Sequence, residues 1–109
     1  MSYSILTIDN FKKEFKKLAK KYPSLKNDLK LIIDELELNP LLGVQISQNC
    51  RKIRMSIASK GKGKSGGARI ITLIFVASEK IYLLSIFDKS DKENLSDKEI
   101  QLLIDSLLD

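Results

Sequence analysis

The stretch of sequence that decides the fold is Arg51–Val76, which reads RKIRMSIASKGKGKSGGARIITLIFV. Residues Arg51–Ile57 alternate between apolar and polar side chains, which predicts a half-buried strand with one open face. Arg69–Val76 is β-branched, aromatic and apolar on both faces, so it predicts a strand near the middle of a sheet. The run between them, Ser59–Arg69, holds four basic residues and four glycines and cannot contribute to a core. Strand, glycine-rich turn and strand together predict a hairpin.

The same glycine-rich run resembles a relaxed phosphate-binding P-loop, with Ala58 in place of the first glycine. In a P-loop the glycine-rich turn opens a helix, and the amides of that helix bind phosphate. Here a strand follows the turn, and the chain is short for a nucleotide-hydrolysing domain. The context therefore argues against a P-loop.

Apolar residues at helical spacing predict two helices before this hairpin, joined by a short link at Pro23. Ser24 is placed to cap the second helix, which ends at Asn39-Pro40. So short a link predicts an antiparallel helical hairpin. The apolar stripes are Phe11, Phe15, Leu18, Ala19 and Tyr22 in the first helix, and Leu25, Leu29, Ile32, Ile33 and Leu36 in the second.

The remaining segments complete the predicted fold. Residues 3–8 predict a first strand, residues 41–49 a loop, and residues 81–87 a last strand. Ser96 and Glu99 have the spacing of a capping box, which opens a C-terminal helix. We therefore predict a single α+β domain over residues 1–109, in the order β-α-α-β-β-β-α. Its antiparallel sheet carries the helical hairpin on one face and is followed by the C-terminal helix.

The net charge of +5 is unevenly distributed. Residues 51–69 contain seven cations and no anion, whereas residues 88–109 carry a net charge of −4. Mutual repulsion in such a cluster lowers stability unless a polyanion relieves it, and nucleic acid is the natural candidate. A basic surface that only maintains solubility is the alternative, and it describes the lysines of the first helix better than this cluster.

Composition excludes several classes of site. A single cysteine excludes an intramolecular disulfide, and the absence of histidine removes the ordinary general base and the usual zinc site. The N-terminus does not resemble a signal peptide, and the longest apolar run, Ile70–Ala77, is too short to cross a bilayer. We therefore expect a cytoplasmic protein that uses no metal and no cofactor.

Lysine and arginine must carry out any catalysis. In RNA cleavage the 2′-OH attacks the neighbouring phosphate, arginines stabilise the extra negative charge, and a lysine whose pKa neighbouring cations lower can transfer protons. Strand alternation places Lys52 and Arg54 side by side, the hairpin partner adds Arg69, and the end of the last strand adds Lys89. The same residues could instead only hold phosphates, and the residues alone favour binding over catalysis.

Several segments resemble the RelE/ParE toxin superfamily, and most closely its HigB-like branch, whose members carry this lysine-glycine hairpin. The likeness spans nearly the whole chain. The segments are Phe11–Lys17, Tyr22-Pro23-Ser24-Leu25, Asn39-Pro40, Lys52-Ile53-Arg54, Ser59–Arg69 and Ile81–Ser90.

This resemblance implies the toxin of a type II toxin-antitoxin system, an endoribonuclease that cuts mRNA in the ribosomal A site without a metal. It implies a cognate antitoxin, commonly of helix-turn-helix type, as partner beside the ribosome and mRNA. By position, the resemblance makes Lys52, Arg54, Arg69 and Lys89 catalytic. The predicted RNA-binding residues are Arg51, Lys60, Lys62 and Lys64.

One departure concerns tyrosine. Many RelE members have a catalytic tyrosine near the C-terminus, whereas this chain has none after Lys89, and Tyr82 lies within the last predicted strand. The C-terminal helix is either a gate or antitoxin contact, or simply packed on the sheet. The alternatives are a ParE-like DNA gyrase inhibitor and a non-catalytic RNA-binding module. We expect Arg69→Ala to abolish cleavage while the fold survives, and Lys62→Ala mainly to weaken RNA binding.

Overall fold

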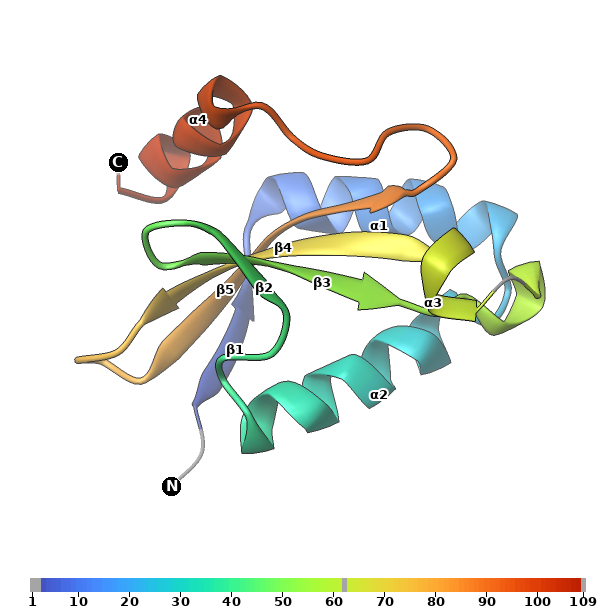
Figure 1. Ribbon diagram of the computed structural model, residues 1–109, viewed down its shortest axis with the longest axis horizontal. Coiled ribbons are helices and arrows are strands. Elements are labelled where there is room, and N and C mark those ends of the chain that lie inside the picture. The colour runs from blue at the N-terminus through green and yellow to red at the C-terminus, as the bar shows by residue number, and fades with distance from the viewer. Residues whose placement is uncertain (1–2, 62, 109) are drawn as a thin grey trace.

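A computed structural model describes residues 3–61 and 63–108 of the chain. The strands form one five-stranded sheet in the order β1-β5-β4-β3-β2 (Figure 1). The predicted α+β class and the predicted order of the major elements are confirmed, with further elements added. In chain order these are β1 (Ser4–Thr7), α1 (Asp9–Lys21), α2 (Leu25–Leu38), β2 (Val44–Ser47), β3 (Cys50–Met55), the short 3-10 helix η1 (Ala58–Lys60), α3 (Gly63–Gly66), β4 (Ala68–Phe75), β5 (Lys80–Asp88) and α4 (Asp97–Leu108).

The centre of the sheet is the antiparallel meander β3-β4-β5, as predicted, and β4 is its middle strand. Two predictions about the edges were wrong. Residues 41–49 are not only a loop, because they contain β2, which pairs antiparallel with β3. The sheet is also not purely antiparallel, since β1 pairs parallel with β5 at the other edge.

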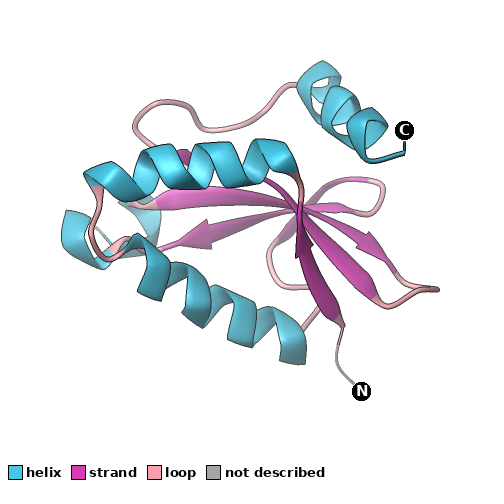
Figure 2. Ribbon diagram, turned by 180° about the vertical axis from the view of Figure 1, so that it is seen from behind, coloured by secondary structure: helices cyan, strands magenta, loops and turns pink. Residues whose placement is uncertain are grey.

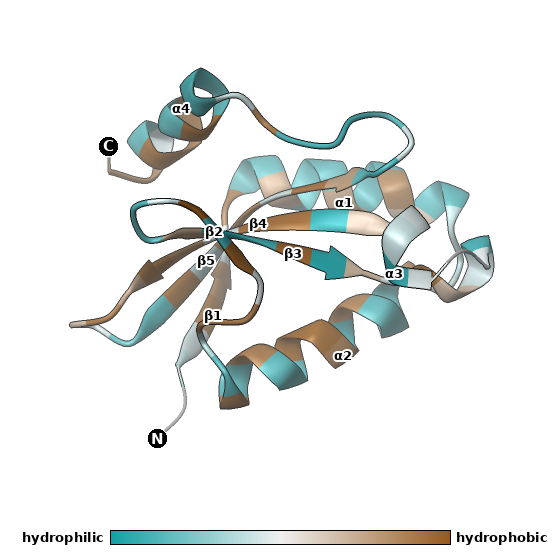
Figure 3. Cartoon of the chain, viewed as in Figure 1, coloured by the Kyte–Doolittle hydropathy of each residue, from teal (hydrophilic) through white to brown (hydrophobic). Residues whose placement is uncertain are grey.

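The helices cover both faces of the sheet. Helices α1 and α2 diverge from their short link across one face, and α4 lies on the other side (Figures 1 and 2). Each face has its own apolar core beneath its helices, and the strands are largely hydrophobic (Figure 3). Phe11, Leu25, Ile53 and Ile70 belong to the core under α1 and α2.

The glycine-rich run is not a simple turn, as η1 and α3 lie between β3 and β4. Gly67 is required where β4 begins, because an added Cβ would lie only 2.0 Å from the carbonyl oxygen of Met55. The predicted capping box is confirmed: the Ser96 N–H donates to Glu99 Oε1 at 3.0 Å, and the Glu99 N–H donates to Ser96 Oγ at 3.1 Å. Ser24 does not cap α2 in the predicted way, because its hydroxyl donates to the Asp28 carboxylate at 2.7 Å.

Candidate functional site

Three of the predicted catalytic cations lie on one face of the sheet. Arg54 on β3 is the direct cross-strand partner of Arg69 on β4, and Lys52 is the partner of Ile71. Ile71 belongs to the core beside α4, whereas Ile53, between Lys52 and Arg54, belongs to the opposite core. The open side of β3 therefore faces the same way as α4, and the three side chains are not dispersed. We call Lys52, Arg54 and Arg69 the cationic face.

Arg69 is buried, contrary to the prediction of an exposed cation, with only 1% of its surface accessible. Its Nη1 donates to the carbonyls of Lys64 at 3.0 Å and Ala68 at 3.1 Å, and its Nη2 donates to the carbonyl of Ser65 at 3.3 Å. Two of the guanidinium nitrogens therefore hold α3 against β4. The Nε of Arg69 is buried and has no hydrogen-bond partner.

The segment between β5 and α4 covers the cationic face. The same Glu93 Oε1 lies 3.8 Å from the Nζ of Lys52 and 3.9 Å from the Nε of Arg69. Lys52 also donates to Asn94 Oδ1 and, at 3.5 Å, to the Glu93 carbonyl. A carboxylate therefore occupies the position between two cations where another anionic oxygen could bind.

The predicted catalytic and RNA-binding side chains differ in their exposure to solvent. Arg54 and Lys64 are exposed, and none of the ion pairs within residues 3–61 and 63–108 involves Arg54. Lys89 is exposed beside the start of β4, since its N–H donates to the Gly67 carbonyl at 3.0 Å. Lys62 lies outside the described residues.

Arg51 and Lys60 are not brought to the cationic face. Alternation along β3 turns Arg51 to the opposite side, where its Nη1 donates to the Gly43 carbonyl at 3.0 Å. The Lys60 ammonium lies 2.6 Å from Asp88 Oδ1, and its side chain is only 12% exposed. Both predicted RNA-binding side chains are therefore engaged in internal contacts, because the surrounding chain supplies acceptors that sequence spacing does not reveal.

Asp88 is the centre of a buried polar cluster that anchors the glycine-rich segment. Its carboxylate accepts hydrogen bonds from the Tyr22 hydroxyl at 2.6 Å, from Lys60, and from both the N–H and the hydroxyl of Ser90. Burial alone raises the pKa of Asp88, but these hydrogen bonds outweigh burial and hold the pKa well below its ordinary value. The hydrogen bond to Asp88, together with burial, raises the pKa of Tyr22.

A second set of contacts ties the glycine-rich segment to α2. The Asp28 carboxylate accepts from the Ala58 N–H at 3.2 Å and from the Ser24 hydroxyl. The Ser59 N–H in turn donates to Ser24 Oγ at 2.8 Å. The segment that carries the basic run is therefore fixed at η1 by α2, by β5 through Asp88, and by Arg69 at α3.

Sequence reasoning missed Glu93, Asn94, Asp88 and Tyr22 as neighbours of the predicted cations. The acidic character of residues 88–109 was the available signal, since an anionic segment next to a cationic one is free to fold onto it. Spacing gives no indication of the pair formed by Lys60 and Asp88, which stand 28 positions apart.

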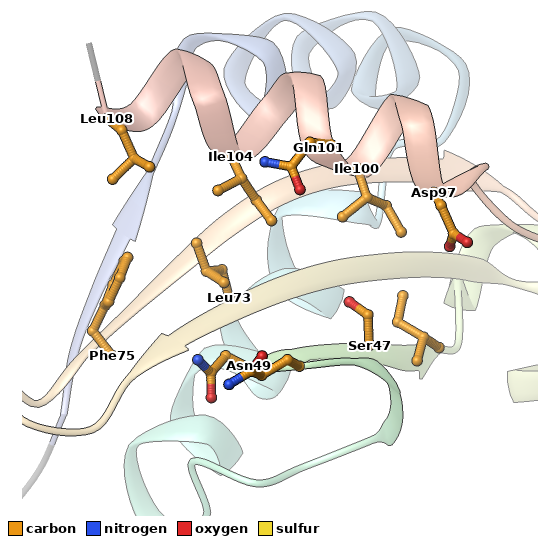
Figure 4. Close-up of a pocket in the computed structure, with 11 residues that line it drawn as sticks. Ser47, Asn49, Leu73, Phe75, Asp97, Ile100, Gln101, Ile104 and Leu108 are labelled. Carbon is orange, nitrogen blue, oxygen red and sulfur yellow. The ribbon is translucent and has the colours of Figure 1, made fainter.

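A groove of about 550 Å³ lies between α4 and the end of the sheet, along the β2–β3 hairpin. Ile100 and Ile104 point from α4 toward Leu73, and Ser47 and Asn49 line the hairpin side (Figure 4). Its lining is mainly apolar and amide in character, with Asp97 at one end. This groove is chemically distinct from the cationic face.

In the part of the chain that the structure describes, no helix is long and apolar enough to span a membrane. No cluster of three or more histidine, cysteine, aspartate or glutamate side chains able to hold a metal ion is found among those same residues.

The sequence profile of one family, described as the RelE toxin of the RelE/RelB toxin-antitoxin system, matches residues 8–105. The chain belongs to the RelE toxin family. Solved structures of RelE toxins share its fold, at sequence identities too low to show more than the fold.

An isolated Escherichia coli RelE toxin is 16% identical, with a TM-score of 0.62 over 94% of this chain and 96% of that one. A double arginine-to-alanine mutant of the E. coli toxin in the free state gives 18% identity and a TM-score of 0.62, over 85% of this chain and 90% of that one. A chain of the RelBE2 toxin-antitoxin complex of Mycobacterium tuberculosis is 13% identical, with a TM-score of 0.55 over 81% of this chain and 99% of that one. The RelE-like fold predicted from the sequence is confirmed.

Proposed function

We propose that this RelE-family chain is the toxin of a type II toxin-antitoxin pair and that it cleaves mRNA on the ribosome at the cationic face. The observation that carries the proposal is the shared orientation of Lys52, Arg54 and Arg69 on β3 and β4. The Nε of Arg69 supports it, because this buried N–H has no hydrogen-bond acceptor and lies 3.9 Å from the Glu93 carboxylate, so it favours the arrival of an anionic oxygen.

The proposed reaction needs charge stabilisation and two proton transfers. The ribose O2′ forms a bond to phosphorus, the bond from phosphorus to O5′ breaks, and a 2′,3′-cyclic phosphate and a 5′-hydroxyl result. A base takes the 2′-OH proton, and an acid protonates the leaving O5′. We assign stabilisation of the phosphorane charge to Arg54 and to the Nε of Arg69, and proton transfer to Lys52 and Lys89.

The three tyrosines of the described residues make contacts other than with the cationic face, and Tyr3 packs against the core under α1 and α2. The Tyr22 hydroxyl is directed to Asp88, in the core under α1 and α2. Tyr82 packs edge-to-face on Phe75, with ring centroids 5.7 Å apart. This arrangement supports the proposed assignment of proton transfer to lysines.

The proposal includes a cognate antitoxin as partner and the cytoplasm as the site of action, where ribosomes and mRNA are present. The family profile supports the antitoxin, since it describes the toxin of a toxin-antitoxin system. The helix-turn-helix type of antitoxin and the HigB-like branch stay predictions.

The test is brief induction of the chain in bacterial cells, followed by mapping of cleaved messages. We expect growth arrest and cuts within codons of translated messages. Arg54→Ala should lower the cleavage rate by about 10²–10³-fold, as loss of a charge-stabilising donor does. The matched control is Lys98→Ala, which removes one exposed cation from α4. Intact messages with DNA damage would replace the proposal with gyrase inhibition, and RNA binding without cleavage would replace it with a binding module.

A further inference from the structure

The outer side of α1 carries six lysines, at positions 12, 13, 16, 17, 20 and 21, and all six are exposed. They fall in two rows, Lys12-Lys16-Lys20 and Lys13-Lys17-Lys21, each with a spacing of four residues. Successive lysines in a row are about 6 Å apart along the helix axis, since each residue rises about 1.5 Å. We call these six side chains the lysine stripe.

The lysine stripe is not neutralised by the protein. The ion pairs in the described part of the chain engage Lys52, Lys60, Arg69 and Lys92, and none engages a lysine of α1. Lys21 makes one internal contact, with its Nζ 5.4 Å from the centre of the Tyr22 ring.

The one carboxylate in the middle of α1 is turned away from the stripe. Glu14 Oε1 accepts hydrogen bonds from Asn10 at 2.8 Å, from the Ser85 hydroxyl at 2.7 Å and from the Ile86 N–H at 3.3 Å. Glu14 therefore binds the part of β5 that lies beyond the segment paired with β1. Asp9 is the other acidic residue of α1 and lies at helical spacing only from Lys12 and Lys13, and no ion pair of the described residues joins it to either lysine.

This arrangement is unfavourable for α1 on its own. Like charges four residues apart destabilise a helix by a few tenths of a kcal/mol per pair. The helix dipole favours cations only in the last turn, where Lys20 and Lys21 lie, and not near the first turn, where Lys12 and Lys13 lie. A solvated surface is the simplest role for these lysines, but it leaves their mutual repulsion in place, whereas a polyanion would relieve the repulsion among all six.

The position of the stripe separates it from the cationic face. Helix α1 packs on the sheet face opposite to that of Lys52, Arg54 and Arg69 (Figure 2). Its six lysines are exposed on the side away from the sheet. The molecule measures 37 × 32 × 22 Å. A nucleic-acid segment on the stripe is therefore a different segment from one that enters the cationic face.

The chemistry of the stripe selects its partner. A basic amphipathic helix can lie on a membrane only by inserting its apolar side, and here that side is in the core, with Phe11 buried and Phe15 packed beside it. The outer side of α1 has no aromatic residue on which an unpaired base could stack. Regular rows of lysines without stacking residues fit the phosphates of a regular double helix.

We propose that the lysine stripe of α1 binds the phosphate backbone of double-helical RNA, as a second nucleic-acid contact on the side of the molecule away from the cationic face. This contact does not require cleavage. The proposal rests on the proposed function in one respect: the proposed action on mRNA is the reason for choosing double-helical RNA over DNA.

The experiment compares two charge-matched triple variants of the full chain. The stripe variant is Lys12→Gln, Lys16→Gln and Lys20→Gln. The control variant is Lys26→Gln, Lys30→Gln and Lys98→Gln, which removes three exposed cations elsewhere and changes the net charge equally. Glutamine is a good helix former, so both variants are expected to fold, as circular dichroism would verify.

Binding of a short RNA duplex is measured by fluorescence anisotropy at several salt concentrations, with a DNA duplex and anionic vesicles as further probes. Each lost phosphate contact removes about 0.9 from the slope of log affinity against log salt. We expect the stripe variant to lose about 2 to 3 from the slope with the RNA duplex, and the control variant to lose less than 1. A loss of slope with the RNA duplex supports the proposal whether or not a similar loss is seen with the DNA duplex.

Equal losses in the two variants would overturn the proposal, because they would reflect net charge alone. A stripe effect on vesicles or on DNA that is absent with the RNA duplex would also overturn it. Arg54→Ala is measured alongside and should retain duplex binding through the stripe, so a failure of the cleavage proposal and a failure of this one give different results.

Discussion

The substitution Asp88→Asn tests whether the buried polar cluster anchors the glycine-rich segment. The Asp88 side chain is fully buried, and its carboxylate accepts four hydrogen bonds, two of them from Ser90. Asparagine retains one acceptor oxygen, and its amide can donate to the Tyr22 hydroxyl. The interaction that it cannot replace is the charge-assisted bond with the Lys60 ammonium at 2.6 Å.

The magnitude follows from the surroundings of this pair. Removing one partner of a buried ion pair costs about 3–5 kcal/mol, because it leaves an uncompensated charge. The Lys60 side chain is 12% exposed and lies on a short surface segment, so its ammonium can turn toward water after the substitution. We therefore expect the free energy of unfolding to fall by about 2–3 kcal/mol at pH 7, with the melting temperature on the order of 10 °C lower.

The effect should depend on pH with a definite sign. The pKa of Asp88 is depressed in the folded chain, so its stabilising contribution is present above the unfolded pKa of about 3.9 and is lost as the pH falls below it. Urea unfolding followed by circular dichroism would measure the difference between wild type and Asp88→Asn from pH 7 to pH 3. The matched control is Asp34→Asn at an exposed position of α2, which should leave stability unchanged. A difference below about 0.5 kcal/mol at pH 7, or one that stays constant down to pH 3, would refute this account.

Three further outcomes are expected. Glu93→Gln removes the carboxylate that lies between Lys52 and Arg69 and should raise the affinity for inorganic phosphate about 2- to 5-fold in a calorimetric titration. The expected gain is small because half-exposed ion pairs are weak. An unchanged affinity would contradict the view that this carboxylate occupies an anion-binding position. Gly67→Ala forces a Cβ to within 2.0 Å of the Met55 carbonyl oxygen and should lower stability to urea by more than about 2 kcal/mol, which an ordinary unfolding midpoint would disprove. Ser96→Ala removes the cap of α4 and should cost about 1 kcal/mol, seen as faster amide hydrogen exchange in the first turn of α4, and unaltered exchange there would argue against the cap.

The meander and the helices were predictable because their signals are local. Alternation from Arg51 to Ile57 depends only on the period of a strand, and it correctly placed Lys52 and Arg54 on one face. The capping box at Ser96 is likewise a contact between residues three apart. Such features require no knowledge of the rest of the chain.

The errors concern contacts between distant segments. The four residues of β2 have little pattern of their own and become a strand only because β3 offers a free edge. The parallel pairing of β1 with β5 joins Ile5 to Ile81, and periodicity does not specify partners. Alternation also gives the face on which Arg69 lies, but not the loop that covers it or the carbonyls that it binds.

Arg69 connects the stability of the glycine-rich segment with the chemistry proposed for the cationic face. Its Nη atoms donate to the carbonyls of Lys64 and Ser65, while its Nε has no hydrogen-bond partner and lies 3.9 Å from the Glu93 carboxylate. Replacing Arg69 with alanine would therefore loosen α3 as well as remove a cation, so lost cleavage in that variant would not distinguish folding from catalysis. Arg54 is the sharper probe, because it is exposed on the directly paired position of β3 and takes part in none of the ion pairs in the described part of the chain. An anion that binds the Nε of Arg69 would also stabilise the segment that carries Lys64, since any ligand specific to the folded state shifts the folding equilibrium toward it.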